Sequence, residues 1–169
     1  DQTLTVSATT AFNNLTINTG DLEDGLVAYW KLDDGTGITA TDSSGSYDGT
    51  LTNMEEADWD STTKATLQFT NPYSLNFDGS EYVNCDNITE INGATELSVA
   101  MWVKLDNLSS DNFLISKGDF TLNEAILLWR DESGSVSGRT NTFSVLTGDG
   151  SNQAKLEGAD GIANDNDWH

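Results

Sequence analysis

Sulfur and proline are scarce in this chain of 169 residues, which has one cysteine, Cys85, and one proline. A lone cysteine excludes an internal disulfide. Cys85 ends the strand-like run 82–85, where a small buried apolar side chain is the expected role. A nucleophilic cysteine needs a nearby histidine as its base, and the only histidine is His169. The sequence therefore predicts a structural cysteine.

Basic residues are also few: the chain has 7 Lys and Arg residues against 28 Asp and Glu residues, which gives a formal net charge of -21. Such a surface repels nucleic-acid phosphates and anionic membranes, so no nucleic-acid partner is expected. No stretch is long and apolar enough to span a bilayer, so no membrane insertion is expected. The excess of carboxylates favours divalent cations instead, although most surface carboxylates are simply solvated.

What the sequence does have is 36% hydrophobic residues, 15 glycines and many Ser, Thr, Asn and Asp residues. The hydrophobic share is enough for a packed core. The polar residues bond to their own backbone in turns and weaken helices. No long run carries apolar residues at helical spacing, so we expect an all-β fold of short strands and turns.

Residues 1–24 are predicted to form a separate N-terminal β segment and linker. The runs 3–7 and 12–18 alternate polar and apolar residues, as strands with one buried face do. An acidic linker follows at 21–25. Because the chain starts without Met and has no signal-type segment, we expect a processed product or an excerpt of a larger protein.

Alternation continues beyond residue 25. In the run 25–32, Trp30 shares one face with Leu26, Ala28 and Leu32 and is expected in the core. The runs 74–77 and 81–85 flank Asp78-Gly79 and predict a hairpin. The run 97–105 is apolar on both faces and predicts a buried central strand that contains Trp102. Further strands are expected at 113–119, 125–130 and 142–146, with loops at 133–139 and 148–166.

Several of these pieces, in this order, resemble LamG-like jelly-roll domains of the concanavalin A-like lectin and glucanase superfamily. The motifs are Gly25-Leu26-Val27-Ala28-Tyr29-Trp30, Thr41-Asp42-Ser43-Ser44-Gly45, Asp48-Gly49-Thr50-Leu51, Leu75-Asn76-Phe77-Asp78-Gly79, Met101-Trp102-Val103-Lys104, Ile115-Ser116-Lys117-Gly118 and Asp167-Trp168-His169. The resemblance covers residues 25–169. It implies a two-sheet antiparallel jelly-roll sandwich, a calcium site at one rim, and ligands bound near loops or on a concave face.

The family's domain continues with further strands after Trp168-His169, whereas this sequence stops there. Relative to the family, the jelly roll is therefore incomplete at its C-terminus. We expect either a longer natural product or strands supplied by another copy of the chain, because unpaired sheet edges are costly.

Calcium is the predicted cofactor, with Asp34, Asp42, Asp48 and Asp78 as candidate ligands on neighbouring loops. The alternative is that Asp42 and Asp78 bond to the backbone of their own turns. The stretch 160–167 is a second acidic candidate, but it lacks the spacing of an EF-hand loop.

For a carbohydrate, the usual platform is an exposed aromatic ring with planar polar neighbours, and Trp59, Tyr73 and Trp129 are the candidates. The alternative is that these rings pack in the core. An enzyme is not expected. The segment 56–60 is the only one that resembles the pair of carboxylates of a glucanase. The sequence has no Ser/His/Asp set and no phosphate-binding loop.

Two functions follow from the sequence. The first is a non-catalytic adhesion or glycan-binding module of a larger extracellular, cell-surface protein, whose partner is a surface glycan or protein. The alternative is a structural subunit of a surface filament or layer, assembled by strand exchange between copies. Glycosylation sequons at Asn14, Asn87 and Asn107 matter only if the source glycosylates its surface proteins.

Overall fold

The computed structural model describes residues 25–62, 65, 70–106, 109–119, 124–131, 141–149, 151–158 and 167–169. The predicted strands at 3–7 and 12–18, and the loop at 133–139, lie outside these residues. The chain divides into two compact units, one of residues 1–64 and 70–90 and one of residues 65–69 and 91–169. Each unit is described by itself.

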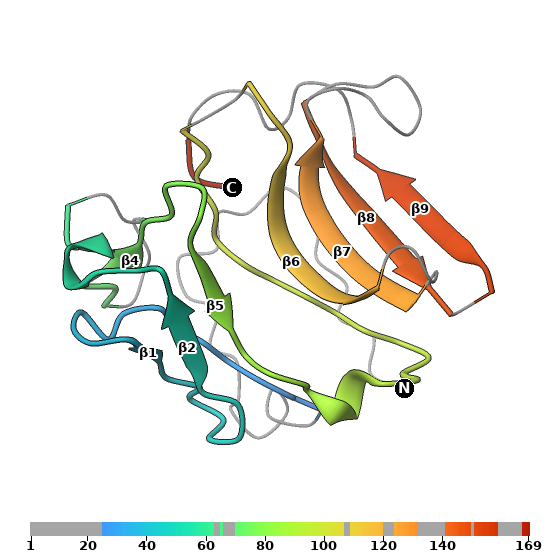
Figure 1. The fold of residues 1–169 in the computed structure, drawn as a ribbon, viewed down its shortest axis with the longest axis horizontal. Coiled ribbons are helices and arrows are strands. Elements are labelled where there is room, and N and C mark those ends of the chain that lie inside the picture. Colours follow the sequence, from blue (N-terminus) through green and yellow to red (C-terminus); the bar gives the residue numbers. More distant parts are fainter. Residues whose placement is uncertain are drawn as a thin grey trace, which may run out of the picture. The chain divides into compact units, whose positions relative to one another are not determined.

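The first unit is built from short strands. β1 (Thr39–Ala40), β2 (Gly49–Thr52) and β5 (Tyr82–Asn84) form an antiparallel sheet in the order β1-β2-β5 (Figure 1). Leu51 of β2 lies opposite Val83 of β5. A second pair joins β3 (Trp59–Asp60) to β4 (Ser74–Leu75), and the 3-10 turn η1 (Glu56–Asp58) leads into β3.

Alternation in β2 decides which face of the three-stranded sheet is buried. Gly49 and Leu51 are buried, whereas Thr50 is exposed and Thr52 is half-buried. The buried face packs on a core cluster of Ala40, Leu51, Met54 and Trp59, with Trp30, Leu32, Tyr73, Leu75 and Val83 packed against it. The opposite face of the sheet is left to solvent.

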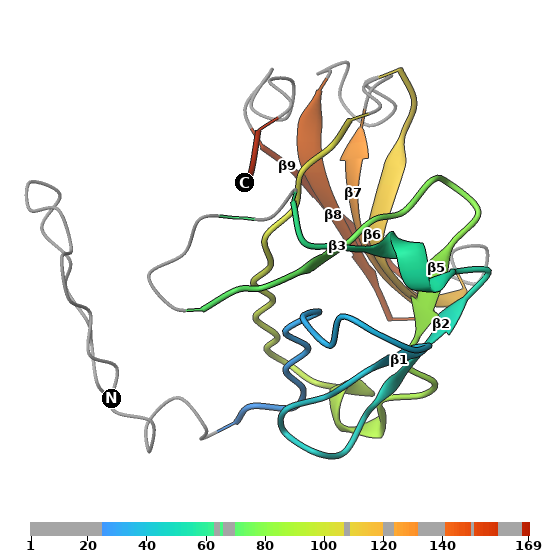
Figure 2. The same cartoon turned by 90° about the vertical axis from the view of Figure 1, so that its left-hand side faces the viewer.

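The second unit holds the longest strands. β6 (Asn112–Asp119), β7 (Glu124–Asp131), β8 (Thr142–Gly148) and β9 (Gln153–Glu157) form one antiparallel sheet in chain order, as Figures 1 and 2 show. The register is continuous from β7 to β9, and β6 carries one irregularity between Phe113 and Ile115. The short 3-10 turn η2 (Thr89–Ile91) lies at the boundary of the two units.

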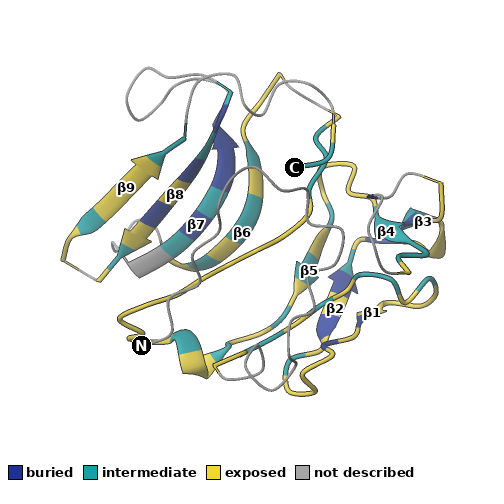
Figure 3. Cartoon of the chain, turned by 180° about the vertical axis from the view of Figure 1, so that it is seen from behind, coloured by how far each residue is buried: buried dark blue, intermediate teal, exposed yellow. Residues whose placement is uncertain are grey.

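Burial in this sheet also follows the two-residue period. Along β8, Thr142, Ser144 and Leu146 are buried while Val145 is exposed, and β9 is mostly exposed (Figure 3). Leu146 packs with Leu127 and Trp129 of β7 in a second core cluster. One face of the sheet is therefore packed.

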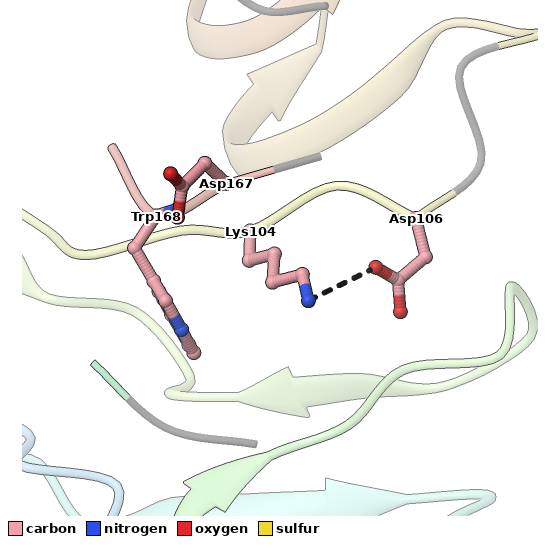
Figure 4. Close-up of polar contacts among 4 residues, drawn as sticks. All are labelled: Lys104, Asp106, Asp167 and Trp168. Atoms are coloured by element: carbon pink, nitrogen blue, oxygen red, sulfur yellow. Dashed lines mark hydrogen bonds and ion pairs between the residues drawn. The ribbon is translucent and has the colours of Figure 1, made fainter. Parts of the chain in front are cut away.

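The last residues pair with the segment before β6. Lys104 and Trp168 form an isolated antiparallel bridge, and Val103 and His169 exchange backbone hydrogen bonds of 2.9 and 3.0 Å. Figure 4 shows Lys104 with Trp168 and its ion pair with Asp106, whose N···O distance is 3.8 Å. The His169 ring meets Phe143 of β8 edge-on, with 5.8 Å between ring centroids. Trp168 and His169 are thus paired with the segment 103–104.

The prediction of an all-β fold is confirmed at the level of class: antiparallel strands dominate the described residues, and helix is limited to two three-residue turns. Neither turn has the length or the apolar character needed to cross a membrane. The strands predicted at 113–119, 125–130 and 142–146 are present as β6, β7 and β8.

The predicted hairpin across Asp78-Gly79 is wrong. The turn exists, with Gly79 at φ +114°, and the Asp78 N–H donates to the Glu81 carboxylate. However, the strands on its two sides pair elsewhere, β4 with β3 and β5 with β2. Leu75 packs against the core cluster beside Trp59, and this contact draws β4 away from β5.

Two other expectations on strands need correction. The run 97–105 is not a buried strand: Leu97, Val99 and Trp102 are exposed, Trp102 by 58%. Among the described residues, only its end takes part in a bridge, that of Lys104 with Trp168. Conversely, residues 153–157 form β9 although the stretch was expected to be loop. β9 lies at the edge of the sheet and pairs with β8 alone, and most of its residues are exposed. Because the strand is largely polar, its sequence does not show the apolar alternation that predicts a strand.

Candidate functional site

Asp42 is the most heavily bonded side chain of the first unit and is 2% exposed. Its Oδ1 accepts the N–H groups of Tyr29 at 2.8 Å and Ser44 at 2.9 Å. Its Oδ2 accepts the Ser44 hydroxyl at 2.6 Å and the N–H groups of Tyr47 at 2.9 Å and Ser46 at 3.2 Å. One carboxylate thereby ties the segment before β1 to the β1–β2 connection.

Electrostatics agree with this role. Burial alone raises the pKa of Asp42, but the hydrogen bonds from the Ser44 hydroxyl and from the N–H groups of Tyr29, Ser44 and Tyr47 outweigh burial. The pKa is held far below its usual range. A carboxylate has about four lone-pair sites, and five protein donors already use those of Asp42. Asp42 therefore bonds to the backbone of its own turn, as the alternative predicts, and its part in a calcium site stays a prediction.

Of the other predicted calcium ligands, Asp34 and Asp48 bond to the backbone of residues 41 and 42, whereas Asp78 lies in a different turn. Asp34 Oδ2 accepts the Thr41 N–H at 3.2 Å, and Asp48 Oδ1 accepts the Asp42 N–H at 2.9 Å. Asp78 lies in its own turn with Glu81. Within the part of the chain that the structure describes, no three His, Cys, Asp or Glu side chains gather as a metal site. Calcium binding through Asp34, Asp42, Asp48 and Asp78 stays a prediction.

The rings proposed as sugar platforms are packing residues to different degrees. Trp59 is 6% exposed in the first core cluster and donates its Nε1–H to the Gly37 carbonyl at 3.0 Å. Trp129 is also 6% exposed, and its ring lies 6.4 Å from that of Phe113. Tyr73 is half-buried against the same cluster as Trp59. Neither tryptophan presents a ring face to solvent.

In the segment 56–60, which resembles a glucanase carboxylate pair, the carboxylates of Asp58 and Asp60 bond to nearby backbone. Asp58 Oδ2 accepts the Glu55 N–H at 2.6 Å as part of a capping box on η1. Asp60 Oδ1 accepts both the N–H and the hydroxyl of Thr62 at 2.6 Å. These bonds give Asp58 and Asp60 a structural role.

A different surface has the chemistry of a sugar platform, namely the solvent face of the β1–β2–β5 sheet. This outer face, as we call it, consists of Thr39, Thr50, Thr52, Tyr82 and Asn84. Thr50 lies opposite Thr39 on one side and Asn84 on the other, and Thr52 lies opposite Tyr82. The Tyr82 side chain is 51% exposed. An aromatic ring thus stands among hydroxyl and amide groups on a paired backbone.

Polar groups of the outer face are available to a ligand. Among the residues that the structure describes, the hydroxyls of Thr39, Thr50, Thr52 and Tyr82 make no side-chain hydrogen bond. Asn84 Oδ1 accepts the Asp86 N–H at 3.0 Å, which orients the amide and leaves its Nδ2 to donate outward. Hydroxyls both donate and accept, so the outer face matches the hydrogen-bonding pattern of sugar hydroxyls.

Sequence reasoning missed Tyr82 and Asn84 as ligand-binding candidates. The sequence places both residues in the strand 81–85, whereas the rings predicted as sugar platforms, Trp59, Tyr73 and Trp129, lie outside the clearest strand patterns. The signal was present in the alternation, because Val83 and Cys85 on the inner face leave Tyr82 and Asn84 on the outer face.

Comparison of the chain with known proteins identifies no similar protein. No family model matches the chain, and neither the curated proteins nor the solved structures give a match.

Proposed function

We propose that this chain is a non-catalytic, extracellular glycan-binding module of a cell-surface protein, with a LamG-like jelly-roll architecture. The observation that supports it best is the outer face, where the exposed Tyr82 ring is flanked by Asn84 and Thr52 on a hydrogen-bonded sheet. A ring offers a flat apolar surface to the C–H face of a sugar, and nearby polar groups fix its orientation.

The rigidity of the site supports the same proposal. The inner-face residues Ala40, Leu51 and Val83 pack with Met54 and Trp59, so the strands that carry the outer face are held by the core on their other side. Asp42 fixes the connection between β1 and β2 through backbone N–H groups. A preorganised site loses little conformational entropy when a ligand binds.

The size of the outer face sets the affinity that we expect. The face spans about 7 Å along a strand and about 10 Å across three strands, which is room for one or two sugar rings. A contact of this size is weak for one copy and becomes useful when several copies act together. Adhesion at a cell surface provides such multivalency.

The test is a glycan array probed with the full chain, biotinylated and displayed on streptavidin. We expect binding to a restricted set of glycans, and Tyr82→Ala to abolish it. Tyr29→Ala is the matched control, because Tyr29 is 43% exposed in the same unit but lies outside the β1–β2–β5 sheet. Absence of binding by a folded chain, or equal loss in both variants, would contradict the proposal. New reducing ends after incubation with a bound oligosaccharide would overturn the non-catalytic part.

The alternative function, strand exchange between copies, depends on the jelly roll being incomplete at its C-terminus and on the strands expected at 3–7 and 12–18. These residues lie outside the described ones, so strand exchange stays a prediction from the sequence.

A further inference from the structure

The second unit carries an exposed apolar run between η2 and β6. Residues 97–103 include no charged residue, and every residue from 92 to 102 is exposed. The exposed large side chains of the run are those of Leu97, Val99, Met101 and Trp102. Figures 1 and 2 show this part of the chain as a long extended stretch that belongs to no strand of the sheet. Apolar side chains gathered on one exposed segment are typical of a surface that binds another protein chain.

The backbone of this run offers a strand edge. In the part of the chain that the structure describes, no residue at 97–102 makes a hydrogen bond. Pairing with the last residues begins only at Val103, whose N–H and C=O both bond to His169. Because successive residues of an extended chain direct these groups to opposite edges, the odd-numbered residues face the edge of His169 and the even-numbered residues face the other edge. An edge with unused N–H and C=O groups is a template for a further strand.

The charges at the two ends of the run indicate which strand fits. Glu96 comes directly before it and Lys104 directly after it. When a second copy of the run is laid antiparallel with Ala100 opposite Ala100, Glu96 of each copy lies opposite Lys104 of the other. Opposite charges in directly opposed positions stabilise an antiparallel pair. Lys104 also lies 3.8 Å from Asp106, and an ammonium group has three donors, so it can bond to both carboxylates.

The same register matches the apolar side chains. On the odd-numbered face, Leu97 lies opposite Val103 and Val99 lies opposite Met101, so every pair is apolar. The hydrogen bonds between the copies come from the even-numbered residues, and the bonds of Val103 to His169 therefore stay in place. Because both copies use the same edge, the assembly closes as a two-fold dimer.

We propose that the segment 96–104 is a dimer interface, through which two copies of this chain pair as antiparallel strands about Ala100. The pairing covers the exposed apolar run and gives its backbone groups partners. The interface does not depend on glycan binding, but a dimer carries two outer faces and so raises the avidity for a surface that presents many glycans.

Amide hydrogen exchange of the unmodified full chain tests the pairing. The exchange is resolved by residue with NMR at two protein concentrations a hundredfold apart, with a reductant present so that Cys85 forms no cross-link. At the higher concentration we expect slower exchange of the N–H groups of Ser98, Ala100 and Trp102, and sedimentation should show a dimer. The N–H groups of Val99 and Met101 should be much less affected. A chain that is monomeric at both concentrations, or protection that does not favour the even-numbered residues, would overturn the proposal.

Exchange of the two charges tests the register. Glu96→Lys places two lysines opposite each other, and Lys104→Glu places two glutamates opposite each other. Like charges directly opposite are destabilising, so each variant should weaken dimerisation at least about tenfold in sedimentation equilibrium. An equimolar mixture of the two variants should dimerise like the unmodified chain, and so should the chain with both substitutions, which keeps the original net charge.

These recoveries separate the pairing from local effects. Lys104→Glu also loses the ion pair with Asp106, but the mixture and the doubly substituted chain retain that loss. Glu56→Lys, which changes the net charge as Glu96→Lys does but lies in η1 of the first unit, is the control and should leave dimerisation unchanged. A dimer that neither single variant weakens, or that neither the mixture nor the doubly substituted chain recovers, would show that the copies do not pair through 96–104.

Discussion

The two units of this chain reach a β structure by different means. In the first unit, strands of two to four residues are joined by irregular segments that depend on side chains such as Asp42, Trp30 and Trp59. In the second, strands of five to eight residues pair through long continuous ladders of backbone hydrogen bonds. Order in the first unit depends mainly on particular side chains, whereas the second unit combines a repeated backbone pattern with one buried side chain, Arg130, which donates to the Ser110 carbonyl and to Asn141 Oδ1.

This difference changes how each unit should respond to single substitutions. A ladder of many similar bonds loses little when one exposed side chain changes. A network centred on one carboxylate loses several hydrogen bonds at once when that carboxylate is removed.

Among the polar substitutions of the first unit, Asp42→Ala should be strongly damaging. It leaves the N–H groups of Tyr29, Ser44 and Tyr47 without their acceptor, and each buried unpaired group costs about 1–3 kcal/mol. We expect the free energy of unfolding, measured by urea titration, to fall by at least about 3 kcal/mol. The comparison in the second unit is Ser144→Ala, which removes one buried hydroxyl contact of 3.2 Å to Thr142 and should cost about 1 kcal/mol. Equal losses in the two variants would remove the distinction between the units.

The low pKa of Asp42 also predicts how stability depends on pH. Its folded pKa lies below that of a carboxyl in the unfolded chain, about 3.9. The stabilisation from the charged form is fully present above that value and is lost progressively as the pH falls below about 4. Urea titrations between pH 7 and pH 2 should show a decline in this acid range. Asp42→Asn, which cannot titrate, should show a smaller decline, and an unchanged slope would contradict the assignment.

How far the sequence predicts the molecule differs between the units for the same reason. β6, β7 and β8 follow from alternation alone, because a long ladder obeys the two-residue period wherever it runs. The hairpin across Asp78-Gly79 failed because a turn dipeptide shows where the chain turns but does not show which strands pair. Pairing there depends on the packing of Leu75 beside Trp59, a contact between distant parts of the sequence.

The candidate site shows the same limit. Alternation in the run 81–85 already placed Tyr82 and Asn84 on one face, yet only the pairing of β5 with β2 brings Thr50 and Thr52 beside them. Trp59 and Trp129 illustrate the converse, since nothing in their local sequence reveals that each ring lies in a core cluster.

Gly49→Ala tests packing under the outer face. A methyl group at Gly49 would overlap the Val83 side chain and come within 3.2 Å of Cys85 Sγ. Overpacking of this kind costs about 1–3 kcal/mol. Val83→Ala made in the same chain should recover part of the loss, and the double-mutant cycle measures that coupling. Additive losses, with no recovery, would show that the close approach of β2 and β5 does not require a glycine.

The smallest effect is expected at the edge of the long sheet. Leu156 lies on β9 opposite Val145 and is 71% exposed, so Leu156→Thr removes little buried area while it keeps a residue that favours strands. We expect the free energy of unfolding to change by less than about 0.5 kcal/mol, because the β8–β9 pairing uses backbone groups that the substitution leaves in place. The measurement is made at two protein concentrations tenfold apart. A loss above about 1 kcal/mol that is the same at both would mean that Leu156 packs within its own chain and that the ladder depends on side chains as the first unit does. A loss that grows with concentration would mean that Leu156 is buried between copies, since only an associating protein has a concentration-dependent stability.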